Sequence, residues 1–113
     1  MILATRKLTL TLPSGSVDIP ILIHAPTQGD RCWECSFSIG WPEGDRNGVV
    51  RGFDSVQAVY LTMQRIAVEL YGSPYHASGS LRWDKPGDGY GFPMPKHGYD
   101  DLIGEDRHAQ IPD

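Results

Sequence analysis

The sequence predicts an α+β fold, with an antiparallel sheet of four to five strands and one amphipathic helix packed on one face. Several segments in the first half of the chain alternate apolar and polar residues, and one later segment repeats apolar residues with helical period. A chain of 113 residues is expected to form a single domain. We place this domain at residues 1–95, followed by an acidic, poorly ordered tail over residues 96–113.

Two alternating segments near the start of the chain predict a β-hairpin. Residues 7–12 place three leucines on one face, and residues 17–24 place valine and isoleucines on one face in the same way. The turn formers at residues 13–16 separate the two segments. Because Pro20 has no backbone N–H, we expect its segment to be a sheet edge or a locally broken strand.

The third alternating segment contains the two cysteines. Residues 33–41 place Cys35 on the apolar face, and Cys32 precedes it by three positions. Residues three apart in a strand point to opposite faces, so this C-x-x-C is not expected to bind a metal ion or form a disulfide. Turn-forming residues at 42–48 then predict a loop, and residues 49–53 predict a short returning strand.

Residues 54–71 carry the strongest local pattern, with apolar residues at the spacing of an amphipathic helix. The apolar positions are Val56, Val59, Tyr60, Met63, Ile66, Ala67, Leu70 and Tyr71. Asp54 is a predicted N-cap, Gln57 completes a capping box, and Gly72 is predicted to be left-handed just past the helix end. The polar residues expected to flank the solvent side are Thr62, Gln64, Arg65 and Glu69.

Charge and hydropathy exclude several classes of function. Ten basic residues against 14 acidic ones give a net charge of −4, and the basic residues form no cluster in the sequence, which argues against nucleic-acid binding. No apolar run approaches the length of a membrane helix, and the N-terminal residues do not match a signal peptide. We therefore expect a cytoplasmic protein with neither nucleic-acid nor membrane partners.

A segment rich in Gly, Pro and aromatic residues follows the helix and has two interpretations. In the structural one, the aromatic rings lie flat on the domain and close its core, with a short strand at residues 80–83. In the functional one, a mobile loop presents side chains to a partner or ligand. The candidate binding residues are Tyr75, His76, Trp83, Asp88, Tyr90, Phe92 and His97.

Catalytic and metal-binding patterns are weak. The four histidines lack the H-x-x-x-H and H-E-x-x-H spacings of metal sites, and no G-x-S-x-G nucleophile motif occurs. We expect no cofactor, no metal ion and no defined catalytic residues. The strongest remaining group is His76 and His97 with Asp88 between them, which supplies acid and base side chains.

Several motifs together resemble a known family. They are a W-x-C-x-F-x-I strand at Trp33, Cys35, Phe37 and Ile39, a G-x-D-S-x-Q-A helix start at residues 52–58, and shorter matches at 70–75, 81–83 and 90–93. Over residues 6–93 the chain resembles a family of small bacterial proteins of unknown function. The resemblance implies an α+β fold of bacterial origin, and it brings no reaction or catalytic residue with it.

Two functions of different classes remain open. The first is a non-enzymatic protein-interaction module of the immunity or accessory type, whose acidic surface meets a basic protein partner. The alternative is a small hydrolase or ligand-binding domain that uses His76, His97 and Asp88. Pairing of an exposed strand with a second copy of the chain would in addition produce a homodimer.

Overall fold

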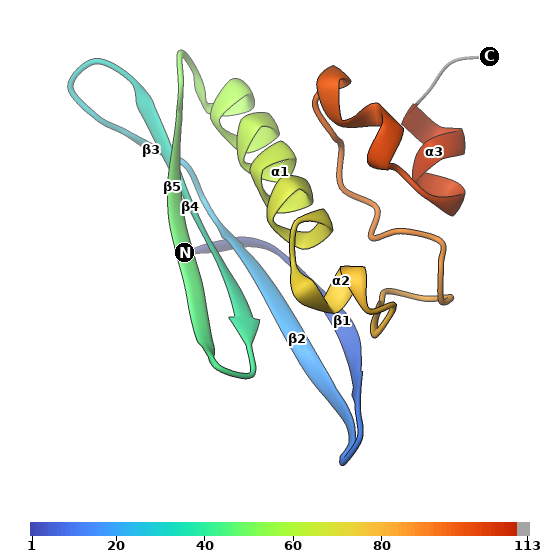
Figure 1. Cartoon of the computed structure of the whole chain (residues 1–113). Coiled ribbons are helices and arrows are strands. Elements are labelled where there is room, and N and C mark those ends of the chain that lie inside the picture. Colours follow the sequence, from blue (N-terminus) through green and yellow to red (C-terminus); the bar gives the residue numbers. More distant parts are fainter. Residues whose placement is uncertain (111–113) are drawn as a thin grey trace.

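Residues 1–110, the part of the chain that the computed structural model describes, form a six-stranded antiparallel sheet with one long helix on one face (Figure 1). The strands are β1 (Ile2–Leu12), β2 (Gly15–His24), β3 (Thr27–Gln28), β4 (Trp33–Trp41), β5 (Gly44–Gly52) and β6 (Leu81–Arg82). They lie in the order β3-β4-β2-β1-β6, and β5 pairs with β4. The α+β prediction is confirmed, and the two-residue strands β3 and β6 bring the sheet to one strand more than expected. Within these residues, no helix has the length and apolar character needed to cross a membrane.

The predicted hairpin is present, but its second strand is not a sheet edge. β1 and β2 pair along their length, and β2 also pairs with β4 over residues 21–23. The ladder between β2 and β4 stops beside Pro20, whose ring lies against Gly40. Pro20 therefore breaks the pairing locally, as its missing N–H requires, while the residues after it keep β2 inside the sheet.

The hairpin of β4 and β5 is tighter than predicted. Its register is uninterrupted along β5 and reaches the pair Trp41↔Gly44, so the turn consists of Pro42 and Glu43. The prediction of a loop at residues 42–48 is wrong for residues 44–48, because these residues belong to β5. Pairing with the buried strand β4 outweighs the low strand propensity of glycine, aspartate and asparagine.

Helix α1 (Ser55–Tyr71) starts where predicted. The Asp54 carboxylate accepts a hydrogen bond of 2.7 Å from the backbone N–H of Gln57. The Gln57 side chain in turn accepts one of 2.7 Å from the N–H of Phe53. These reciprocal bonds satisfy backbone donors that the first turn of a helix leaves without partners.

The helix end differs from the prediction. Gly72 has a φ of −85°, so it is right-handed, and its N–H donates to the carbonyl oxygen of Val68 at 2.9 Å. The chain then enters the short helix α2 (Pro74–Ala77), whose N-cap Ser73 accepts the N–H of His76 at 3.1 Å. Because a second helix begins at once, no left-handed reversal is needed at the end of the first.

The face that α1 packs on β4 and β5 is rotated from the predicted one. Its buried residues are Ala58, Thr62, Ile66, Ala67 and Leu70. Val56 and Tyr60, predicted on the apolar face, are instead 76% and 48% exposed. The solvent-facing position expected for Thr62 is wrong, because its hydroxyl donates to the carbonyl oxygen of Ala58 at 2.7 Å and needs no water.

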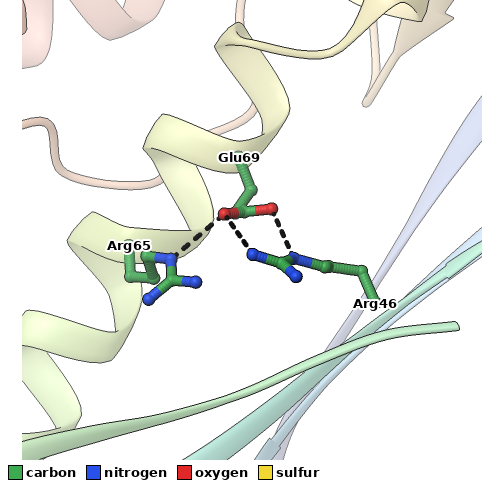
Figure 2. A network of polar contacts seen from close by, with 3 residues as sticks. All are labelled: Arg46, Arg65 and Glu69. Carbon is green, nitrogen blue, oxygen red and sulfur yellow. Dashed lines mark hydrogen bonds and ion pairs between the residues drawn. The ribbon is translucent and has the colours of Figure 1, made fainter.

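A polar network joins α1 to β5 (Figure 2). The Glu69 carboxylate accepts hydrogen bonds from Arg46 Nε at 2.9 Å and from Arg65 Nε at 3.1 Å. Burial acts to raise the pKa of Glu69, but the two guanidinium groups outweigh it and hold the pKa below its ordinary value. These side chains are partly exposed, so the network orients the helix more than it stabilises the fold.

The described part of the predicted tail is folded. Residues 96–110 contain the 3₁₀ helix η1 (Lys96–Asp101) and helix α3 (Gly104–Gln110), and α3 lies on the side of α1 away from β5 (Figure 1). Leu102 and Asp106 are only 3% and 4% exposed. The prediction of a poorly ordered tail differs from this structure, because the burial of Leu102 and Asp106 depends on partners that are distant in the sequence. Residues 111–113 of the predicted tail lie outside the described residues.

Candidate functional site

A cleft of about 350 Å³ lies between the end of α1, helix α2 and η1. It is lined by Val68, Tyr71, Gly72, His76, Met94, His97, Gly98 and Asp101, and we call it the His cleft. The structure thus brings together His76 and His97, which are 21 positions apart in the sequence. Asp88, their predicted acidic partner, does not line the cleft, and Asp101 supplies the carboxylate there.

His76 is held in place from two sides. Its Nδ1 shares a hydrogen bond of 2.5 Å with the Tyr90 hydroxyl, and its ring centroid lies 4.7 Å from that of Tyr71. Burial lowers the pKa of His76, and the Asp101 carboxylate opposes this only in part. The imidazole is therefore neutral at pH 7, in a fixed orientation.

The wall behind His76 is built around one buried carboxylate. Asp106 accepts hydrogen bonds from the Tyr71 hydroxyl at 2.7 Å and from the N–H groups of Tyr90 and Gly91 at 2.9 and 2.8 Å. Burial, followed by the nearby Asp106 carboxylate, raises the pKa of Tyr71 well above its ordinary value and that of Tyr90 to about 12. Both phenols keep their protons at neutral pH, so they act as fixed hydrogen-bonding groups rather than as bases.

The chemistry available in the His cleft is hydrogen bonding more than covalent catalysis. Its described lining contains no serine, threonine or cysteine, and the hydroxyl of Tyr71 is already committed to Asp106. Among residues 1–110, no three His, Cys, Asp or Glu side chains are grouped so as to hold a metal ion. The neutral His76 is suited to bind a polar ligand or to move a proton.

The aromatic segment after the helix closes the core. Tyr90 and Phe92 are 2% and 5% exposed, which fits the structural interpretation of this segment. Trp83 remains 43% exposed, and the Arg6 guanidinium stacks on its ring at 3.8 Å while donating to the Tyr90 carbonyl oxygen at 3.0 Å. Leu81 and Arg82 form β6, which confirms the short strand expected at residues 80–83.

The remaining predicted residues lie apart from one another. Tyr75 stacks on Trp41 with ring centroids 5.2 Å apart, and its hydroxyl donates to the Glu43 carboxylate at 2.7 Å. Asp88 is half-buried beside Gly104, which has no space for a side chain there. The seven candidate residues therefore do not form one continuous binding surface.

Sequence reasoning missed a second surface on α1. A shallow hollow there is lined by Ser55 and by six apolar residues that we call the α1 patch, namely Leu3, Pro26, Val56, Val59, Tyr60 and Met63. Leu3, Val56 and Tyr60 are 50%, 76% and 48% exposed, whereas Val59 and Met63 are partly buried and pack against the core. The helical spacing identified Val56 and Tyr60 but predicted them as core, since periodicity alone does not say which apolar residues the sheet covers.

Comparison with known proteins gives a family and no assigned activity. The chain belongs to the family described as Domain of unknown function (DUF6968), whose model matches residues 4–94. The match confirms the expected resemblance to a family of unknown function. Searches of curated proteins and of solved structures find no significant match.

Proposed function

We propose that this member of the DUF6968 family is a non-enzymatic protein-interaction module of the immunity or accessory type. The observation that supports this is the exposure of Leu3, Val56 and Tyr60 of the α1 patch around one apolar hollow. Large apolar side chains gathered on one exposed surface mark sites of protein association more often than isolated ones do. In this proposal α1 is the recognition element.

The way α1 is anchored fits a recognition role. The face of the helix next to the patch packs on the sheet, and its start is fixed by the reciprocal bonds of Asp54 and Gln57. Val56 and Tyr60 are therefore displayed four positions apart on a rigid helix, which lowers the entropic cost of binding.

We further propose a basic protein as the partner. The protein carries a net charge of −4, with Asp54 exposed beside Phe53 and Val56. Complementary charge would speed the encounter, and the apolar patch would then hold the complex. This division of roles predicts that added salt slows association more than it weakens the final contact.

The test is affinity capture with the intact protein, comparing wild type with Val56→Asp. An aspartate in the first turn of a helix is favoured by the helix dipole, so this change should leave the fold intact while placing a charge in the patch. Val17→Asp is the matched control, because Val17 is exposed on the β1–β2 hairpin. Specific capture of one basic protein that Val56→Asp loses and Val17→Asp retains would support the proposal.

Two results would count against this function. One is the absence of any specifically captured protein, and the other is a captured protein that both variants retain equally. In either case the second candidate function takes precedence.

That second candidate is a ligand-binding domain or small hydrolase at the His cleft. It is favoured by one observation, that His76 and His97 line the same cleft with Asp101. Screening small polar compounds by NMR should then shift the signals of these residues. A variant with both His76→Ala and His97→Ala that binds the same compounds as wild type would exclude this site.

A further inference from the structure

We propose that the outer edge of β5 pairs with the same edge of a second copy, forming a two-fold homodimer with one continuous sheet. This inference does not rest on the α1 patch or on the function proposed above. Within the described residues, β5 pairs with β4 alone, so one edge of a nine-residue strand is left without a strand partner.

This edge has neither of the two backbone features that most directly prevent strands from associating, a bulge or a proline. Its pairing with β4 has no register shift from one end to the other, and the strand contains no proline. Natural edge strands are commonly protected by bulges, by prolines or by charged side chains. The charges on β5 are of both signs, which permits pairing in one particular register.

The sequence of β5 is self-complementary when read antiparallel. Pairing two copies about Gly48 aligns all nine residues, with Gly44 of one copy opposite Gly52 of the other. In that register Asp45 faces Arg51 of the second copy, and the symmetry produces this pair twice. Directly opposed residues lie on the same face of an antiparallel pair, so the two charges meet.

The outer face of the sheet extends this charge pattern. Glu34 lies opposite Arg51 in the register of β4 and β5, and Arg51 Nε donates to its carboxylate at 3.0 Å. In the proposed dimer Arg51 of each chain would therefore lie between Glu34 of its own chain and Asp45 of the other copy. If the second copy of β5 is shifted by two residues in either direction, Asp45 faces an uncharged residue instead of Arg51.

The position of α1 permits this pairing. The helix lies over β4 and β5, so two copies joined at β5 would place their helices two strand spacings apart, or about 10 Å. This is the ordinary distance between packed helices. Leu61 and Phe53 line a hollow on the β5 side of the helix together with Arg51, which places apolar surface near the new contact.

The test is the solution mass of the full chain, measured by light scattering and sedimentation. Wild type should have twice the monomer mass of 12.5 kDa. Asp45→Arg and Arg51→Glu each place like charges opposite one another twice, and each variant alone should dimerise at least about tenfold more weakly. In a mixed dimer of the two variants, position 45 of each chain faces a side chain of opposite charge at position 51 of the other chain. The mixture should therefore recover the dimer.

Asp84→Arg is the control, since it makes the same charge change on an exposed loop and should keep the wild-type mass. Circular dichroism verifies that each variant is folded, and in wild type the outward amides of β5 should exchange slowly with solvent. The proposal is overturned if wild type is monomeric at about 100 μM, where even a dissociation constant of about 10 μM leaves most chains paired. It is also overturned by a dimer that both single variants retain.

Discussion

The Tyr71 hydroxyl donates a hydrogen bond of 2.7 Å to Asp106, joining the last residue of α1 to α3 across 35 positions of the chain. The same carboxylate binds the backbone N–H groups of Tyr90 and Gly91. One buried side chain therefore connects the long helix, the glycine-rich segment and the C-terminal helix. This explains why residues beyond 95 belong to the folded domain.

Asp106→Ala should destabilise the protein by about 2 to 4 kcal/mol, because it leaves three donors without their acceptor in a largely buried site. The free energy of unfolding in urea measures this effect. Asp100→Ala is the control, since Asp100 is exposed and its loss should change stability by less than about 0.5 kcal/mol. Equal stabilities for the two variants would contradict the role given to Asp106.

Thr62→Glu should cost at least about 4 kcal/mol, because it buries a charge where Thr62 is 0% exposed. Val56→Glu should have little effect, since Val56 is 76% exposed in the first turn of the helix. Thermal unfolding followed by circular dichroism compares the two variants. If Val56→Glu unfolds as readily as Thr62→Glu, the orientation of α1 is wrong.

Stability should fall on acidification in a way that depends on His76. Burial lowers the pKa of His76 below 6.5, so the unfolded chain binds more protons between the folded and unfolded pKa values. The stabilising contribution is present above the unfolded pKa and is lost as the pH falls through the folded one. Between about pH 7 and pH 5, the melting temperature of wild type should fall more than that of His76→Gln. His108→Gln, at an exposed position, should follow wild type, and parallel curves for all three proteins would refute the assignment.

Arg6 should be energetically coupled to Trp83. The guanidinium of Arg6 lies 3.8 Å from the Trp83 ring centroid and 4.9 Å from that of Phe92. A double-mutant cycle with Arg6→Ala and Trp83→Ala should yield a coupling energy of about 1 kcal/mol in urea unfolding. Strictly additive effects of the two substitutions would mean that the stacking contributes nothing to stability.

The sequence by itself determined most of the secondary structure. Alternation identified β1, β2 and β4, and it placed Cys35 in the core, where it is 0% exposed. Asp54 and Gln57 marked the start of α1 because capping depends only on residues within one turn. These features rest on interactions between near neighbours in the chain, and a local pattern contains all the information they need.

Tertiary structure decided which surfaces those elements cover. It placed β2 inside the sheet despite Pro20, buried Thr62 while exposing Val56, and folded the C-terminal segment around Asp106. It also brought His76 and His97 into one cleft with Asp101 in place of Asp88. Each of these outcomes depends on partners far away in the sequence, and their burial and hydrogen bonding arise only when the sheet, α1 and the C-terminal segment pack together.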